Sequence, residues 1–355
     1  MSKSSSRLTG IDLAYVIALL GTVAVSYLFV VGKKTGLLSH VHFFPLLDLF
    51  PALFLFLNGL TSSLMMRDAH ISTRKVSAFL SKKGSILIVI GIALSPLWPL
   101  NIFIVCGLFY ALAPTLTRLN TTILRVILVA VALLTISTIS FTFIRTTVHY
   151  SVLKVSGSTM LDLVAFVFFN GYYSILPWGF FFLLGIIHGR GQVRVVGILQ
   201  PSNILAIFWF LLAMGAQYFS LGFYQDREEL YLGKQFPLDN KLFIPSFLFF
   251  GMASNILITN ACIYMMKDWP KNRFRTIIQD LSSVKYSMYF FHLFAGIITI
   301  RMFNLETFGG HWGVVIYLVL MTFFLAWFSL YWKRKINELG PIEYLIKKIA
   351  GSTKS

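Results

Sequence analysis

Residues 39–67 read SHVHFFPLLDLFPALFLFLNGLTSSLMMR, an apolar run that two histidines precede and one aspartate interrupts. Apolar runs of about 20 residues recur along nearly the whole chain of 355 residues and leave no stretch for a separate soluble domain. The chain is 57% hydrophobic and only 12% charged, and its mean hydropathy is +0.78. The sequence therefore predicts an all-α, polytopic integral membrane protein whose single transmembrane domain covers residues 1–355.

Hydropathy predicts about ten transmembrane helices. They cover residues 11–31, 43–65, 84–98, 102–117, 122–143, 174–188, 202–222, 242–266, 283–303 and 311–332. Pro96 and Pro99 favour a tight turn or a re-entrant hairpin between the short third and fourth segments. Residues 160–170 are apolar but too short to span. Residues 72–83, STRKVSAFLSKK, are predicted to form a basic loop that lies on anionic headgroups.

The distribution of basic residues predicts the orientation. With the N-terminus inside, 22 of the 30 Lys and Arg residues fall in cytoplasmic segments, which satisfies the positive-inside rule and places both termini in the cytoplasm. The same bias explains the net charge of +17, so nucleic-acid binding is not expected. We expect a multi-pass protein of the cytoplasmic (inner) membrane of a prokaryote. Cys106 and Cys262 lie inside apolar segments and indicate neither a disulfide framework nor a metal site.

The histidines and the aspartate of the opening stretch are the first candidate site. This orientation puts His40 and His42 at the external mouth of the second helix, with Asp48 about 9 Å deeper. An ionised carboxylate costs about 2.5–3.5 kcal/mol near mid-membrane, so Asp48 should face a polar cavity or the protein interior. A structural role, as a helix cap and interfacial anchors, is the simpler interpretation of these three residues. A catalytic role is the alternative, because an imidazole titrates near neutral pH and a carboxylate can orient it.

Several blocks resemble the transmembrane acyltransferase superfamily, specifically its heparan-α-glucosaminide N-acetyltransferase-like branch, which is related to the acyltransferase-3 family. The blocks are RLTGIDLAYVIALLGTVAVS at 7–26, DLFPALFLFLNGLTSSL at 48–64, NIFIVCGLFYAL at 101–112, LPWGFFFLLGIIHGR at 176–190 and SMYFFHLF at 287–294. The resemblance implies an acyltransferase that moves an acyl group, expected to be acetyl, from cytoplasmic acyl-CoA to an extracytoplasmic carbohydrate of the cell envelope. Acetyl-CoA would be a donor substrate, and no tightly bound cofactor or metal is implied.

The resemblance also implies roles for individual residues. A histidine just before the second-helix block would be catalytic, which points to His40 or His42, with Asp48 as its partner. Tyr289 and His292 match a Tyr-x-x-His pattern and form a second candidate site.

The basic segment 72–83 offers candidates for donor binding. Arg74, Lys75, Lys82 and Lys83 could bind the 3′-phosphate of a CoA donor, although attraction to the membrane surface is the simpler interpretation of these residues.

Two departures from the family pattern keep a second function open. Many relatives carry Arg and His where this chain has Tyr15 and Ser26, and neither residue supplies a permanent cation or titrates near pH 7. The alternative is a non-catalytic relative that acts as a transporter or an envelope-assembly subunit. The lipid bilayer is the expected partner in both cases, and the sequence leaves a homo-oligomer open.

The predicted orientation can be tested by cysteine labelling. Single cysteines at Lys34 and Glu229 should react with an impermeant maleimide in intact cells, whereas one at Lys82 should react only after permeabilisation. Labelling at Lys82 in intact cells would reverse the topology.

Overall fold

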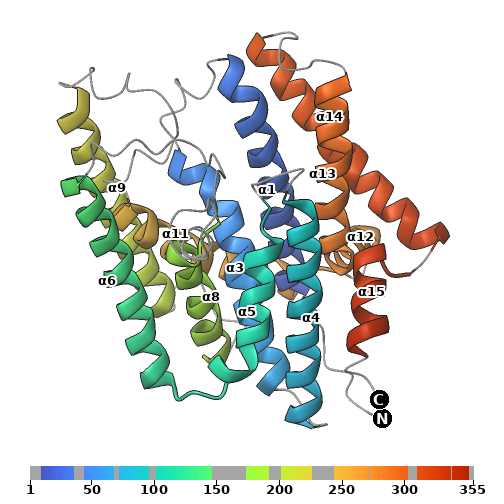
Figure 1. Cartoon of the computed structure of the whole chain (residues 1–355), viewed down its shortest axis with the longest axis horizontal. Coiled ribbons are helices and arrows are strands. Elements are labelled where there is room, and N and C mark those ends of the chain that lie inside the picture. The colour runs from blue at the N-terminus through green and yellow to red at the C-terminus, as the bar shows by residue number, and fades with distance from the viewer. Residues whose placement is uncertain are drawn as a thin grey trace, which may run out of the picture.

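In a computed structural model the chain folds into a bundle of helices (Figure 1). The structure describes residues 9–35, 44–67, 72–95, 101–145, 173–191, 201–225, 244–270, 272–302, 310–336 and 338–351. Every element in these ranges is a helix. The elements are α1 (Thr9–Thr35), α3 (Phe44–Arg67), α4 (Thr73–Leu94), α5 (Phe103–Leu116), α6 (Thr121–Arg145), α8 (Ile175–Arg190), α9 (Pro201–Gln225), α11 (Ile244–Lys267), α12 (Arg273–Ser283), α13 (Lys285–Met302), α14 (Gly310–Tyr331), the π-helix η4 (Trp332–Ile336) and α15 (Pro341–Ala350).

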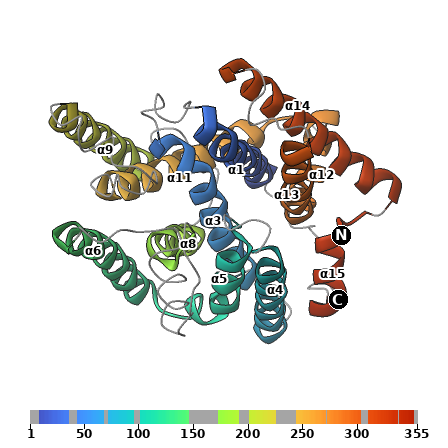
Figure 2. The ribbon, with the colours of Figure 1, turned by 45° about the horizontal axis from the view of Figure 1, so that its top comes forward.

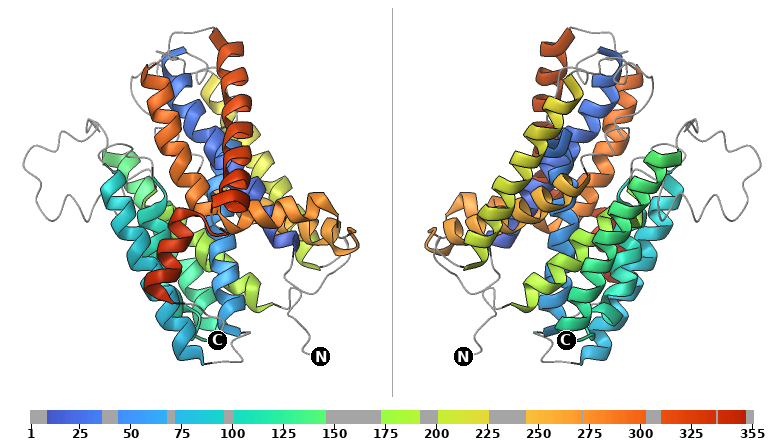
Figure 3. Two further views of the ribbon diagram at one scale, coloured as in Figure 1. Left: turned by 90° about the vertical axis from the view of Figure 1, so that its right-hand side faces the viewer. Right: turned by 90° about the vertical axis from the view of Figure 1, so that its left-hand side faces the viewer.

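The long helices form two rows with α3 between them. Figure 2 shows α6, α8, α5 and α4 in one row, and α9, α11, α1, α13 and α14 in the other. The two rows also lie on opposite sides of α3 in the perpendicular views of Figure 3. Because α3 packs between the rows, most of its residues from Ala52 to Leu60 are completely buried. A polar side chain on this part of α3 can therefore be satisfied only by other helices.

Within the described residues, four helices are long and apolar enough to cross a membrane by length and composition: Thr9–Tyr27, Asp48–Arg67, Thr73–Leu94 and Phe247–Lys267. The outward faces of α6, α9 and α14 are also apolar, with exposed side chains such as Leu133, Leu211 and Phe323. Large exposed apolar faces are unfavourable in water and are compatible with association with a lipid bilayer.

Nine of the ten predicted helices agree with the structure to within four residues at each end. The exception is α4, because residues 73–83, predicted as part of a loop, continue directly into the apolar helix. Four basic residues lower the hydropathy of this stretch, yet it contains no helix breaker, so the helix starts at Thr73. The turn containing Pro96 and Pro99, and residues 160–170, lie outside the described residues.

The short helices α12 and α15 were not predicted, because each is apolar on one face only. Asn272 caps the start of α12 by accepting a hydrogen bond from the Arg275 amide at 3.1 Å. Ser282 of α12 donates to Asp12 of α1 at 2.7 Å. Lys333 of η4 pairs with Asp280 of α12 at 2.8 Å. Thus α12 joins the beginning of α1 to the end of α14.

The backbone of α3 approaches that of α8 closely. A Cβ atom added at Gly59 would collide with the carbonyl oxygen of Phe182, and one added at Gly185 would collide with that of Phe56. Gly185 and Gly189 form a GxxxG pattern, which lets helix backbones approach closely in membranes. These glycines bring the α8 backbone against α3 and fix the depth of α3 in the bundle.

We expect Gly185→Ala to lower the stability of the folded protein by about 1–3 kcal/mol, because the added methyl group meets backbone atoms that cannot rotate away. Gly215→Ala in α9 is the matched control, since an added Cβ there meets nothing within 4 Å. The control should be neutral or slightly stabilising, as alanine favours helices over glycine by about 1 kcal/mol. Thermal unfolding in detergent measures both, and equal melting temperatures for the two variants would contradict the assignment of this contact.

Candidate functional site

Three tyrosine hydroxyl groups converge on one buried amide. Asn58 of α3 is fully buried, and its side-chain oxygen accepts hydrogen bonds from Tyr15 of α1 at 2.9 Å and Tyr110 of α5 at 2.8 Å. Tyr286 of α13 lies 3.3 Å from the same oxygen and 2.8 Å from the Tyr110 hydroxyl. We call Tyr15, Asn58, Tyr110 and Tyr286 the tyrosine cluster. It joins four helices through one polar centre inside an otherwise apolar core.

Two lysine side chains lie against the rings of this cluster. The ammonium of Lys83 is 3.7 Å from the ring centre of Tyr110 and 4.8 Å from that of Tyr286. The ammonium of Lys285 is 3.2 Å from the ring centre of Tyr15. Aromatic faces attract cations, more strongly where water is excluded. Lys83 is only 9% exposed, and none of the ion pairs in the described part of the chain involves it. The side-chain nitrogen of Lys83 thus lies in the interior against two aromatic rings, with no ion pair to a carboxylate among the described residues.

A series of polar side chains continues from the cluster along α13. Lys285, Tyr289 and His292 follow at intervals of four and three residues, which places them on one face of the helix. Lys285 is half-buried, whereas Tyr289 and His292 are each 1% exposed. The seven-residue separation between Lys285 and His292 corresponds to about 10 Å along the helix axis. The series therefore leads from the beginning of α13 to a fully buried imidazole.

His292 occupies an aromatic cage. Its ring centre is 4.4 Å from that of Tyr289 and 5.8 Å from that of Tyr27. The hydroxyl of Tyr27 donates to the backbone carbonyl of His292 at 2.9 Å, and the hydroxyl of Tyr289 accepts from the Ile102 amide at 3.3 Å. Neither ring nitrogen of His292 makes a hydrogen bond of ordinary geometry among the described residues. Buried polar atoms are nearly always paired, so these two nitrogens are open to a water molecule, a ligand or a proton. The side chains of Asn255 and Thr259 also lack such partners among the described residues.

A carboxylate from the last helix fixes the start of α13. Glu343 of α15 accepts from the backbone amides of Tyr286 at 2.7 Å and Ser287 at 3.3 Å, and also from the hydroxyl of Ser287. These amides belong to the first turn of α13, where no intrahelical acceptor exists. A negative charge is favourable at a helix N-terminus. Glu343 thereby positions Lys285 and Tyr286 at the tyrosine cluster.

The structure locates most of the predicted site residues. Tyr289 and His292, predicted as a second site, do lie together. Asp48 is half-buried in the second turn of α3, and its predicted partners His40 and His42 lie outside the described residues, so this site stays a prediction. Among the described residues, no three side chains of His, Cys, Asp and Glu are grouped as a metal site would require.

The four predicted donor-binding residues divide into two groups. Arg74, Lys75 and Lys82 are exposed on α4, whereas Lys83 points inward to the tyrosine cluster. The four residues therefore do not form one surface patch, because Lys83 is buried beside the tyrosine cluster.

The two departures from the family pattern have distinct roles. Tyr15 carries no charge itself, but the ammonium of Lys285 lies over its ring, so a cation is present at that place from another helix. Ser26 donates to the backbone carbonyl of Thr22 at 2.9 Å, which is a local contact within α1.

Sequence reasoning did not identify Asn58, Tyr110 and Tyr286 of the tyrosine cluster, or Lys285, which lies against it. A signal was present, since an amide or ammonium inside an apolar segment is costly and usually faces the interior. Asn58 follows seven apolar or proline residues after Phe50, and Lys83 directly precedes the apolar half of α4. Which partners they meet depends on contacts between helices that are far apart in sequence.

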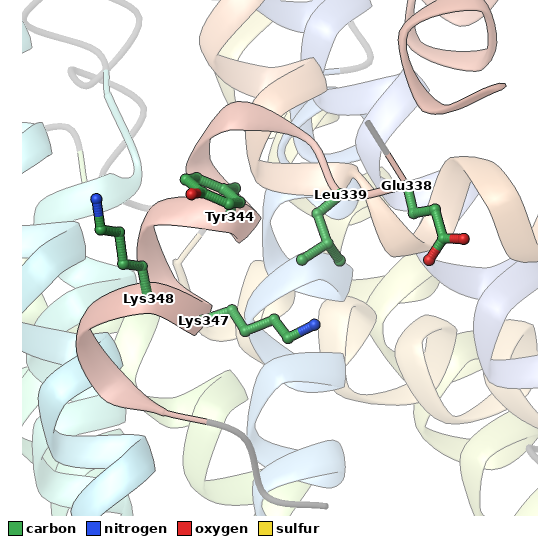
Figure 4. Close-up of a pocket in the computed structure, with 5 residues that line it drawn as sticks. All are labelled: Glu338, Leu339, Tyr344, Lys347 and Lys348. Atoms are coloured by element: carbon green, nitrogen blue, oxygen red, sulfur yellow. The ribbon is translucent and has the colours of Figure 1, made fainter. Parts of the chain in front are cut away.

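A separate surface cavity of about 490 Å³ lies at α15 and is lined by Glu338, Leu339, Tyr344, Lys347 and Lys348 (Figure 4). Lys347 and Lys348 leave the helix in opposite directions in this view. Tyr344 is 47% exposed, so α15 presents an aromatic ring and two ammonium groups outward. This combination is typical of a helix at a membrane surface.

The Glu343 contact predicts a pH dependence of stability. Burial raises the pKa of Glu343, and its hydrogen bonds oppose the increase only in part. The folded protein therefore binds a proton at this site more tightly than the unfolded chain, so the stabilisation is present at low pH and is lost as pH rises through the raised pKa. From about pH 4 to about pH 8, the melting temperature of the parent should fall relative to that of Glu343→Gln. If the difference between the melting temperatures of the parent and Glu343→Gln did not change with pH, this prediction would be contradicted.

Comparisons with known proteins assign no family to the chain. No family model, no curated protein and no solved structure matches it. Its function has to be argued from the polar interior just described.

Proposed function

We propose that the protein is a membrane-embedded acyltransferase that moves an acyl group, expected to be acetyl, from cytoplasmic acyl-CoA to an extracytoplasmic carbohydrate. The observation that carries the proposal is the buried imidazole of His292 at the inner end of a polar series, whose ring nitrogens make no hydrogen bond of ordinary geometry among the described residues. The sequence blocks that resemble acyltransferases support it. One of those blocks contains Tyr289 and His292.

The reaction requires a base, and His292 is the residue that we assign to it. A hydroxyl oxygen of the acceptor forms a bond to the thioester carbonyl carbon, and the carbon–sulfur bond breaks. The hydroxyl proton passes to a ring nitrogen of His292 and then to the leaving thiolate, which departs as the CoA thiol. A neutral imidazole with a free lone pair is suited to this transfer. Tyr289, beside it, restricts the rotation of the ring.

The two ammonium groups have a separate role in this proposal. An acyl-CoA is anionic, and a membrane interior disfavours its approach unless positive charge is present. Lys83 and Lys285 supply that charge beside the tyrosine cluster. Lys83 makes no ion pair in the described part of the chain, and in this proposal the anionic donor is the group that pairs with it.

The alternative is a non-catalytic relative that transports a substrate or assists envelope assembly. The position of Ser26 favours it, since its hydroxyl bonds only to its own helix and supplies no base. An intramembrane histidine can also relay protons in a transporter. The two functions differ in one product, because only acyl transfer releases a free CoA thiol in step with acceptor modification.

The test is acyl transfer by purified protein in proteoliposomes, with radiolabelled acetyl-CoA and an envelope glycan extract as acceptor. His292→Gln keeps a side chain of similar size but cannot titrate, and should lower turnover by about 10²–10⁴ while the folded protein is retained. His188→Gln is the matched control, because His188 lies in another apolar helix, 3.3 Å from its partner Asn260, and away from α13. The control should keep the parental rate.

Two results would overturn the assignment. Full activity of His292→Gln would remove His292 from the chemistry and return attention to His40, His42 and Asp48. No thiol release by the parent protein, with every acceptor fraction, would favour the transporter.

A further inference from the structure

A second polar site lies where several helices end. A cavity of about 370 Å³ is bounded by the ends of α3 and α8, the turn after α5 and the start of α4. We call it the arginine pocket. It is lined by Ser63, Met66, Arg67, Thr73, Thr117, Arg118 and Arg190. Six of these seven residues can donate hydrogen bonds from their side chains, and none carries a negative charge.

The guanidinium groups are held in place by neutral oxygens. Arg190 donates to the Thr117 carbonyl at 2.6 Å and to the Thr121 hydroxyl at 3.2 Å. Arg118 donates to the Ser77 hydroxyl at 3.0 Å. Neither Arg118 nor Arg190 forms an ion pair in the described ranges. These contacts restrict the two side chains without neutralising them, so their charge is oriented and uncompensated.

The start of α4 adds a further attraction for anions. Thr73 is its first residue, and the side chain of the preceding Ser72 makes no capping hydrogen bond. The first amides of a helix have no intrahelical acceptor, and the helix dipole favours negative charge there. Hydroxyl groups of Ser63, Thr73 and Thr117 complete the lining. Arginines, hydroxyls and a helix N-terminus together are the usual components of a phosphate site.

We infer that the arginine pocket binds a phosphate group. Its volume is sufficient for a phosphate or a pyrophosphate together with part of the molecule that carries it. Two sources share this chemistry: a soluble phosphorylated ligand, of which acyl-CoA is one, and the head group of an anionic phospholipid. The inference stands on the pocket alone and holds whether or not the chain transfers acyl groups.

The experiment measures binding of inorganic pyrophosphate by calorimetry, with full-length protein in a neutral detergent free of phospholipid. The parent should bind saturably. Arg118→Gln and Arg190→Gln should each weaken binding at least tenfold, because a charge-assisted contact is lost. Arg273→Gln is the matched control: it removes the same charge from an exposed position on α12, which packs against α1 and not at the arginine pocket, and should bind as the parent does.

To distinguish a soluble phosphorylated ligand from a phospholipid head group, the pyrophosphate titration is repeated in nanodiscs of phosphatidylcholine with and without phosphatidylglycerol. Equal pyrophosphate affinity in both nanodiscs indicates a soluble ligand, whereas loss of binding with phosphatidylglycerol indicates that its head group occupies the pocket. Both outcomes support phosphate recognition. Arg118→Gln keeps the test decisive if Arg190→Gln misfolds, since Arg118 loses only a contact at the exposed surface. Unchanged binding in Arg118→Gln, or no binding by the parent, would overturn the inference.

Discussion

The side-chain oxygen of Asn58 is the polar centre on which the arrangement of the bundle depends. It lies on the helix between the two rows, where no water is available, so its partners must come from the protein. Hydroxyl groups from α1, α5 and α13 meet there. If one of these helices shifted, a buried hydroxyl would lose its acceptor, which costs about 1–3 kcal/mol. The glycine contact with α8 leaves α3 little freedom to follow such a shift.

The same centre explains how positive charge is tolerated in the interior. An isolated ammonium in an apolar core is unfavourable, and a carboxylate partner would neutralise it. The ring faces of Tyr110 and Tyr286 instead stabilise Lys83 through their quadrupoles, at 3.7 and 4.8 Å. This arrangement lets Lys83 lie in the interior without an ion pair among the described residues. In the arginine pocket, Arg190 and Arg118 likewise contact neutral groups, which there are carbonyl and hydroxyl oxygens instead of rings.

Much of the helix order could be predicted from hydropathy, because a long apolar run favours a helix regardless of which other helices it contacts. The start of α4 could not, since four basic residues hide a continuous helix from an averaged profile. The pairing of Tyr289 with His292 was predictable from a short local motif. The tyrosine cluster was not, because Asn58 meets Tyr110 across 52 positions and Tyr286 across 228. Contacts between residues so far apart in sequence depend on how the helices pack in three dimensions. The residue pattern of one segment does not determine that packing.

The position of Glu343 has a consequence for the order in which the chain acquires its structure during synthesis. Domains form from the N-terminus as the ribosome proceeds, yet the first turn of α13 needs a carboxylate that is translated 57 residues after Tyr286. Until then the amides of Tyr286 and Ser287 have no protein acceptor, and Lys285 and Tyr286 lack their anchor at the tyrosine cluster. The polar interior is thus completed only when α15 has been made and has docked. A nascent chain that lacks α15 would have its apolar helices but an unfinished polar centre.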